Sequence, residues 1–215
     1  MGIRLKRSPL KFTEDYIQQV LERRYMTNPL YVAFNLHVFP WESDFLLCTK
    51  AYYWYEVEIK ISLSDFKNDF KHKAGKYYTL EHGTSKIGVG TPKWVNNKPI
   101  YNRYEKRYSV RPHYFSYCVP YFLVEDVKKL LPPFAGLCYV TEYGSLEHVY
   151  FPKQLHKEKY TDKDLNLTNK FYYAYRNWRT KSEEWVNKEK ELKSDINFVK
   201  AEYKAALGYP IEEIL

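Results

Sequence analysis

Three ionisable side chains recur at every second position of residues 52–61. The segment is rich in aromatic and β-branched residues, which is typical of a β-strand. Because successive side chains of a strand point to opposite faces, Glu56, Glu58 and Lys60 share one face, and an apolar row occupies the other. An apolar row is ordinary in a strand, whereas a carboxylate followed two positions later by a lysine is a pattern that could perform chemistry.

A further acidic residue, Asp44, precedes this segment. A turn at residues 49–51 would put Asp44 and Glu58 on adjacent strands. Two neighbouring carboxylates repel each other unless a cation joins them, and carboxylate oxygens suit Mg²⁺ or Mn²⁺. Lys60 would reach the same side, where an ammonium group can act on a water or neutralise charge that develops on a phosphate. The alternative is that Glu56, Glu58 and Lys60 form an exposed ion-pair face.

Most of the positive charge is concentrated in one part of the 215-residue chain. Residues 65–112 contain 11 Lys and Arg against 4 Asp and Glu, so they supply +7 of the formal net charge of +8. A basic patch is the feature expected for a polyanion partner, and interleaved aromatics suit stacking on bases. The alternative is a solvated loop whose aromatics pack onto the body of the protein. The predicted nucleic-acid contacts are Lys71, Lys73, Lys76, Lys93, Trp94, Arg103, Lys106 and Arg107.

Hydrophobic periodicity predicts an α/β or α+β protein with a mixed central sheet. Thr13 is a suitable N-cap for the first helix, and Pro40 would end the strand that follows it. Frequent glycines and prolines predict a long loop or loose hairpin over 74–112. In chain order, the other predicted elements are a helix at 14–25, strands at 30–39, 45–48 and 52–61, a helix at 65–73, a strand at 113–119, a helix at 124–131, and strands at 136–141 and 146–151.

The C-terminal part has a different pattern, which predicts a helical extension at 153–215 after a domain at 1–152. From about residue 162 a helical pattern carries an apolar stripe, and Ser194 could cap a last helix. The stripe either packs within the chain or binds a partner protein or a second copy, and a purely protein-binding factor is a further alternative. Its residues recur at intervals of seven and are Phe171, Trp178, Trp185 and Leu192.

The cysteine content indicates a reducing compartment. The cysteines Cys48, Cys118 and Cys138 are odd in number and form no C-x-x-C pair, so we expect buried thiols in a cytoplasmic protein. No apolar run approaches the roughly 18–20 residues of a membrane span, and the N-terminus lacks the pattern of a signal peptide. We therefore expect no membrane contact.

Two stretches of the sequence match a known motif. They read Trp41-Glu42-x-Asp44-Phe45-Leu46 and Tyr55-Glu56-Val57-Glu58-Ile59-Lys60-Ile61-Ser62-x-Ser64-Asp65-Phe66-Lys67-x-Asp69-Phe70-Lys71. This pattern resembles the PD-(D/E)XK nuclease superfamily, and more closely the MmcB-like DNA repair proteins and their phage relatives. The resemblance covers about residues 14–151, since its second half is carried by Tyr114-Phe115, Val119-Pro120 and Pro132-x-x-Ala135-Gly136-Leu137.

The resemblance implies a restriction-endonuclease-like fold and a metal-dependent phosphodiesterase site that acts on DNA. By position, Asp44 and Glu58 match the metal ligands and Lys60 the motif lysine, with Mg²⁺ or Mn²⁺ as the cofactor. Glu14 or Glu22 could match the first-helix glutamate of many members, and Glu56 is either an additional ligand or a partner of Lys60. No proline precedes Asp44, which departs from the usual motif. Since the superfamily includes inactive members, a non-catalytic nucleic-acid-binding or regulatory protein on the same fold is the alternative.

Overall fold

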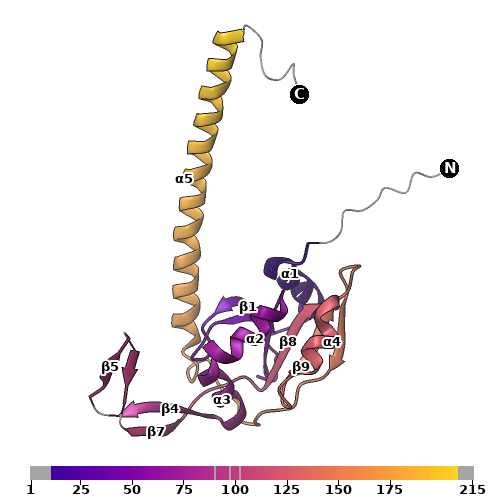
Figure 1. Ribbon diagram of the computed structural model, residues 1–215, viewed down its shortest axis with the longest axis vertical. Helices are drawn as coiled ribbons and strands as arrows, with labels where there is room; N and C mark the ends of the chain where they lie inside the picture. Colours follow the sequence, from indigo (N-terminus) through magenta and orange to yellow (C-terminus); the bar gives the residue numbers. More distant parts are fainter. Residues whose placement is uncertain (1–10, 90, 97, 102, 208–215) are drawn as a thin grey trace, which may run out of the picture. The chain divides into compact units, whose positions relative to one another are not determined.

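The computed structural model describes residues 11–89, 91–96, 98–101 and 103–207, which divide into two compact units, Met1–Leu167 and Thr168–Leu215. Figure 1 shows the elements in chain order. The helices are α1 (Glu14–Tyr25), α2 (Leu63–His72), α3 (Ala74–His82), the 3-10 turn η1 (Tyr121–Leu123), α4 (Val124–Lys128) and α5 (Leu167–Leu207). The strands are β1 (Tyr31–Leu36), β2 (Ser43–Cys48), β3 (Trp54–Ile59), β4 (Thr84–Val89), β5 (Lys93–Val95), β6 (Lys98–Ile100), β7 (Arg103–Tyr108), β8 (Tyr114–Pro120), β9 (Gly136–Val140) and β10 (Leu146–Tyr150).

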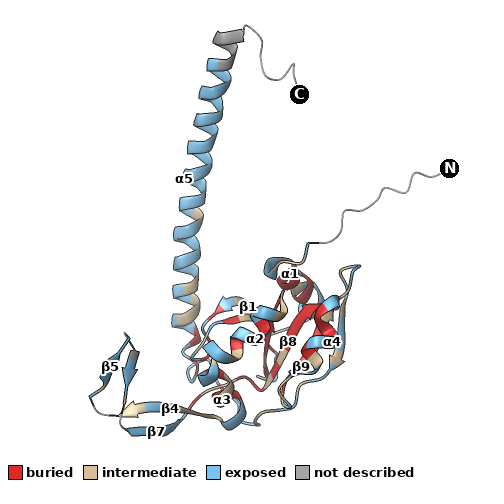
Figure 2. Cartoon of the chain, in the orientation of Figure 1, coloured by how far each residue is buried: buried red, intermediate tan, exposed pale blue. Residues whose placement is uncertain are grey.

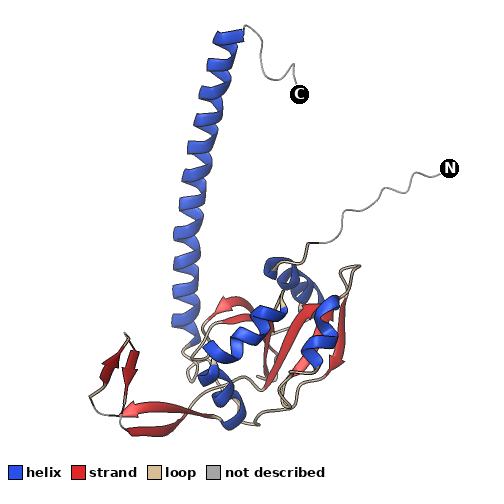
Figure 3. Ribbon diagram, in the orientation of Figure 1, coloured by secondary structure: helices blue, strands red, loops and turns tan. Residues whose placement is uncertain are grey.

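The first unit is built on a six-stranded mixed sheet with the order β1-β2-β3-β8-β9-β10 (Figure 3). The pairs β1–β2, β2–β3 and β9–β10 are antiparallel, whereas β3–β8 and β8–β9 are parallel. The parallel pairs require crossovers, and helices lie in both connections. The predicted mixed α/β class is therefore confirmed.

Helices cover both faces of this sheet. On one face, Ile17 and Leu21 of α1 pack with Phe45, Val57 and other apolar residues. On the other face, residues of α2, α3 and α4 pack against alternate residues of β8, in a core that includes Phe66, Leu80, Phe115, Tyr117 and Val127. Figure 2 shows that these buried residues lie in the central strands and the helices that cover them. Because Val57 faces α1, its neighbours Glu56 and Glu58 face the opposite side of the sheet, toward α2 and α3.

Two helices begin at side-chain caps, of which Thr13 was predicted. The Thr13 hydroxyl accepts a hydrogen bond from Tyr16 N at 3.1 Å, and the Ser62 hydroxyl accepts one from Asp65 N at 3.1 Å. Each cap satisfies a backbone donor that the first turn leaves without an intrahelical partner. Helix α1 has the predicted bounds, and α2 begins where Ser62 ends the strand segment, so α2 lies directly after Lys60.

The prediction of a long loop or loose hairpin over 74–112 is wrong for residues 74–82, whereas the hairpin alternative holds for the residues that follow. Residues 74–82 form α3, whose Leu80 is fully buried, and β4 and β7 then form an antiparallel hairpin with the small β5–β6 hairpin between them. No side chain caps the start of α3, and Gly75 lies in its first turn, so the usual start signals are missing. Helix α3 forms because Leu80 and Lys76 are buried against the sheet face.

The predicted boundary at residue 152 also differs from the structure. Residues after it stay with the first unit, since Lys153 N donates to Phe134 O at 3.1 Å and Leu155 N donates to His113 O at 2.8 Å. Helix α5 runs through Ser194 without a break, so the last helix predicted to start there does not exist as a separate element. None of the helices in the described part of the chain has the length and apolar character to cross a membrane.

Candidate functional site

The E-x-K segment is buried. Glu56 and Glu58 of β3 are 1% and 0% exposed, and Lys60 directly after β3 is 5% exposed. The backbone of Lys60 is fixed to the next strand because its N–H donates to Cys118 O at 3.0 Å. The alternative of an exposed ion-pair face is therefore wrong. Burying charged groups costs free energy unless each is paired, so the partners of these residues define the site.

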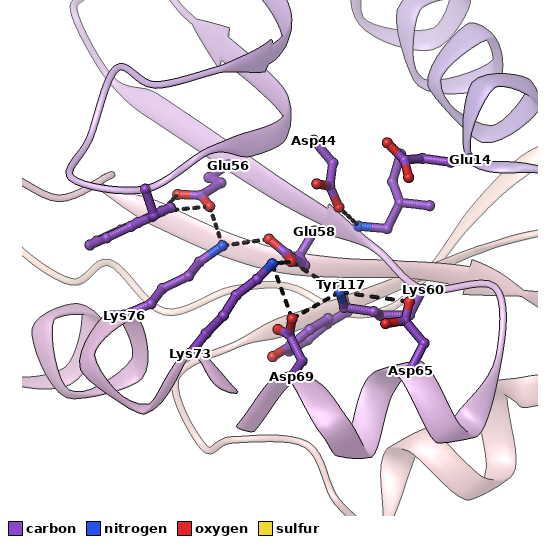
Figure 4. Close-up of polar contacts among 12 residues, drawn as sticks. Glu14, Asp44, Glu56, Glu58, Lys60, Asp65, Asp69, Lys73, Lys76 and Tyr117 are labelled. Atoms are coloured by element: carbon purple, nitrogen blue, oxygen red, sulfur yellow. Dashed lines mark hydrogen bonds and ion pairs between the residues drawn. The ribbon is translucent and has the colours of Figure 1, made fainter. Parts of the chain in front are cut away.

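Three lysines surround the Glu58 carboxylate (Figure 4). Lys60 Nζ lies 3.1 Å and Lys73 Nζ 2.5 Å from its Oε1, and Lys76 donates to its Oε2. Burial alone would raise the pKa of Glu58, but the charges of the three lysines outweigh it and lower that pKa to about 2. Glu58 is therefore ionised at neutral pH, and all three lysines hold their protons against it.

Lys76 also binds the second glutamate of β3. Its Nζ lies 2.7 Å from Glu56 Oε1, while the indole Nε1 of Trp41 donates to both Glu56 oxygens at 2.9 and 3.0 Å. The Lys76 ammonium also lies 5.6 Å from the centroid of the Trp41 ring and 5.1 Å from that of Phe115. Burial raises the pKa of Glu56, and Lys76 opposes that rise. Because Lys76 is itself buried, it is not the surface phosphate contact that the sequence predicted.

Asp69 of α2 completes this network of carboxylates and lysines. Its Oδ1 lies 3.0 Å from both Lys60 Nζ and Lys73 Nζ, and its Oδ2 accepts from the Tyr77 hydroxyl. Tyr117 OH in turn donates to Tyr77 OH at 2.6 Å. The motif resemblance contained Asp69 without a role for it, and Tyr77 was not predicted at all. The i,i+4 spacing of Asp69 and Lys73 on one helical turn was the signal in the sequence.

Asp44 lies near Glu58 at the end of the β2–β3 ladder. The last pair of that ladder is Phe45 with Val57, one residue before Asp44 and Glu58, and the negative charge of Glu58 acts on Asp44. Asp44 Oδ2 accepts a hydrogen bond from Ile59 N at 2.7 Å. Burial raises the pKa of Asp44 to about 7, and the negative charges of Glu58 and Glu14 add to that rise. Among the described residues, Asp44 forms no ion pair with a lysine or arginine, unlike Glu56, Glu58 and Asp69.

The first residues of α1 adjoin this end of the sheet. Gln18 Nε2 donates to Asp44 O at 2.9 Å and to Glu14 Oε1 at 3.4 Å. Figure 4 shows the Glu14 side chain beside Asp44. Of the two first-helix glutamates, Glu14 rather than Glu22 contributes to the electrostatics of Asp44.

The donor atoms only partly fit a hard cation. Asp44 and Glu58 offer carboxylate oxygens, which suit Mg²⁺ or Mn²⁺ in chemistry. Both Glu58 oxygens, however, accept from lysines, and Glu56 is held by Trp41 and Lys76. Among the described residues, no three of His, Cys, Asp and Glu are arranged to hold a metal. A cation at Asp44 and Glu58 would therefore compete with the lysine ammonium groups.

The other basic residues predicted for nucleic acid lie mainly on the paired strands β4 and β7 and on the small β5–β6 hairpin between them. We define the basic hairpin by its exposed charged residues Lys93, Arg103, Lys106 and Arg107. Alternation along β7 puts Lys106 on one face with Tyr104 and Tyr108, and the two arginines on the other. Trp94 of β5 is 65% exposed. Lys71 is exposed on α2, and Lys73 is half-buried at the site.

Three of the four predicted stripe residues of α5 are exposed, and Phe171 is partly buried. Trp178, Trp185 and Leu192 are 63%, 70% and 53% exposed, and Ile196 and Val199 continue the stripe beyond the predicted range. The predicted members recur every seven residues, which places them along one side of the helix. An exposed apolar row of this kind is a candidate contact surface for a partner.

Comparison with models of protein families and with curated proteins found no match. A solved structure that matches the chain is a protein of unknown function from Silicibacter pomeroyi. It is 15% identical, the match covers 81% of this chain and 92% of that chain, and the TM-score is 0.46. No function is inferred from this likeness.

Proposed function

We propose that the protein is a metal-dependent nuclease that hydrolyses phosphodiester bonds in DNA. The observation that carries the proposal is that Asp44 accepts a hydrogen bond from Ile59 N, the residue between Glu58 and Lys60, whose side chains form an ion pair. The raised pKa of Asp44 supports it. Burial and the charge of Glu58 raise that pKa to about 7, and a bound cation would lower it by stabilising the carboxylate.

A restriction-endonuclease-like fold is part of the same proposal, and the arrangement of the sheet and helices supports it. The PD-(D/E)XK resemblance implies a restriction-endonuclease-like mixed sheet with helices on both faces. The sheet of this chain is mixed, α1 covers one face, and α2, α3 and α4 cover the other. Asp44, Glu58 and Lys60 lie together at one end of the adjacent strands β2 and β3. A repair or phage context follows from the resemblance to MmcB-like proteins alone.

Asp44 and Glu58 would hold Mg²⁺ or Mn²⁺, with Glu14 adding negative charge nearby. When bound, such a metal ion polarises a phosphate oxygen and lowers the pKa of a water. Lys60 keeps its proton because Glu58 and Asp69 raise its pKa against the effect of burial. Its role is therefore to stabilise negative charge on the phosphate rather than to accept a proton. Asp69 orients Lys60 and is a positioning residue.

DNA is the proposed partner of the basic hairpin. Its exposed Lys and Arg side chains suit phosphates, and the neighbouring Tyr104 and Trp94 suit bases. Exposed α5 is a separate surface, which we propose binds a second copy of the chain through the stripe that contains Phe171, Trp178 and Trp185.

One observation favours a second candidate function, a non-catalytic nucleic-acid-binding protein on the same fold. Glu58 is neutralised by Lys60, Lys73 and Lys76 without any metal. A buried network in which every charge has a partner can be purely structural. The two candidates therefore differ in whether Glu58 exchanges a lysine for a metal ion.

The deciding experiment is a cleavage assay with a matched pair of lysine variants. Wild-type protein is incubated with supercoiled, linear, single-stranded and branched DNA in Mg²⁺, Mn²⁺ or EDTA. Lys60→Met and Lys73→Met remove ammonium groups that contact the same two residues, Glu58 and Asp69. If Lys60 is catalytic, Lys60→Met lowers the cleavage rate by at least about 100-fold, whereas Lys73→Met lowers it by less than about tenfold.

Folding must be measured alongside, because Lys60 belongs to a buried network. Urea unfolding and DNA binding in EDTA show whether each variant is folded and binds DNA under the assay conditions. Equal losses of cleavage in the two variants would make Lys60 one structural cation among three. Absence of metal-dependent cleavage of all four DNA forms by the wild type would favour the second candidate.

A further inference from the structure

A cavity of about 620 Å³ opens beside the lysine network. It lies between the Pro40–Trp41 segment and the junction of α2 with α3, and its lining includes His72, Lys73 and Tyr78. Pockets of roughly 300–1,000 Å³ are typical for small organic groups. The cavity is therefore large enough for a nucleotide.

Two aromatic side chains in the lining are held in fixed positions. Trp41 is anchored by its Nε1, which donates to both oxygens of Glu56. Tyr78 stacks on His82 with ring centroids 4.3 Å apart and planes within 8°. Aromatic surfaces that are already positioned bind a flat ring at a lower entropic cost than mobile ones. Neither fixing contact was required by the proposed catalytic chemistry.

Positive charge lines the same cavity. Lys73 lies on its wall with its side chain 39% exposed, and His72 beside it is exposed. Lys76 also borders the cavity but is occupied by Glu56 and Glu58. Aromatic rings together with a partly exposed lysine are the combination that binds bases and phosphates of single-stranded nucleic acid.

Lys73 joins the cavity to the candidate catalytic site. Its Nζ contacts Glu58 Oε1 at 2.5 Å and Asp69 Oδ1 at 3.0 Å while its side chain lines the cavity wall. A nucleotide in the cavity would thus have its phosphate within reach of the lysine that contacts Glu58. Lys73 would therefore connect the place where a base binds with the phosphodiester that would be cleaved.

We infer that this cavity receives one unpaired nucleotide of a DNA strand, next to the phosphodiester that the Asp44–Glu58 site would cleave. The inference rests on the proposed function and adds the substrate class, a strand with an unpaired or extruded base. Such a base is reached at a lower cost in single strands and at branches, because little stacking must be broken.

The test is a binding cycle in EDTA, so that it needs no cleavage. Fluorescence anisotropy measures the affinity for a short fluorescein-labelled single strand and for versions with one abasic position, moved along the strand. Tyr78→Ala should weaken binding of the intact strand about tenfold, the loss expected for one base stack. In the wild type, an abasic position at one place should cause a similar loss, and the same position should cost Tyr78→Ala almost nothing more.

Two control variants separate stacking from other effects. Tyr78→Phe keeps the ring and should retain wild-type affinity, while Tyr143→Ala removes a tyrosine that is 84% exposed on the β9–β10 turn and should bind normally. Urea unfolding of each variant verifies that it is folded. Losses that add up in the double perturbation would overturn the inference, as would abasic strands that bind like the intact one.

The outcome is separable from that of the proposed function. A wild type that shows the abasic effect but never cleaves DNA keeps the cavity assignment and removes the nuclease. Cleavage without any abasic effect removes the cavity assignment alone. A free deoxynucleoside monophosphate that competes as strongly as the strand would assign the cavity to free nucleotides and overturn the strand-bound form.

Discussion

Replacing Asp44 by asparagine should stabilise the protein at alkaline pH in the absence of metal. The pKa of Asp44 rises from 3.8 to about 7, chiefly through burial and then through the charge of Glu58. Each pKa unit corresponds to about 1.36 kcal/mol, so ionising Asp44 in the folded state costs roughly 4 kcal/mol as an upper limit. Asparagine avoids this cost, and its carbonyl oxygen can still accept from Ile59 N. We expect Asp44→Asn to raise the free energy of unfolding at pH 8 by about 1–4 kcal/mol.

The sign of the pH dependence follows from the same numbers. Between pH 3.8 and about 7, the folded protein keeps the Asp44 proton that the unfolded chain has lost. The stabilising contribution is fully present below pH 3.8 and is lost as the pH rises through about 7. The advantage of Asp44→Asn over the wild type should therefore grow from pH 5 to pH 8.

Urea unfolding in EDTA at several pH values measures this effect, with Glu42→Gln as the matched control. Glu42 is exposed and lies two residues away, so its replacement should change stability by less than about 0.5 kcal/mol. Added Mg²⁺ should stabilise the wild type by about 2.7 kcal/mol at 100 times its Kd but leave Asp44→Asn unchanged. A variant that is less stable than the wild type by the same amount at every pH would refute the electrostatic account of Asp44.

Three further predictions concern other parts of the chain. Lys76→Met leaves Glu56 and Glu58 without their shared cation and should lower the free energy of unfolding by about 3–5 kcal/mol in urea, while the exposed control Lys71→Met should stay within about 0.5 kcal/mol. Charge reversal of the whole basic hairpin should weaken DNA binding and reduce the slope of log affinity against log salt by up to about 3.6, at roughly 0.9 per duplex phosphate contact; an unchanged slope would make the hairpin a solvated loop. The double variant Trp178→Glu and Trp185→Glu should convert a dimer to a monomer in light scattering; a wild type that is monomeric at all concentrations contradicts this.

The sequence predicted which residues share a face more reliably than what covers that face. The period of two in β3 was sufficient to place Glu58 and Lys60 on one face, and the helix that follows was predicted with its start two residues late. The partners of Glu58 could not be found in this way, because Lys76 belongs to a helix with no cap signal and a glycine in its first turn. Lysines in a basic segment look solvated until a buried carboxylate is known to lie beside them.

The continuity of α5 was obscured for a related reason. Ser194 is a good N-cap residue, but a serine on the exposed side of a long helix does not interrupt it. The stripe of apolar residues was predicted correctly up to Leu192. Its extension through Ile196 and Val199 depends on the helix not ending at Ser194, which only the structure established.

The charge balance around β3 indicates how the lysine-paired network could change into a metal-binding site. The network holds three carboxylates, Glu56, Glu58 and Asp69, against the three lysines Lys60, Lys73 and Lys76. A cation that binds Asp44 and Glu58 therefore adds positive charge that only Asp44 needs. The lysine that can leave Glu58 at the lowest desolvation cost is Lys73, because its side chain is 39% exposed whereas those of Lys60 and Lys76 are 6% and 2% exposed. Since Lys73 also lines the cavity, a phosphate bound there would draw its ammonium away from Glu58 Oε1 and leave that oxygen with Lys60 as its lysine partner, so that a metal would displace one ammonium fewer. Substrate binding and metal binding would then reinforce each other through one side chain.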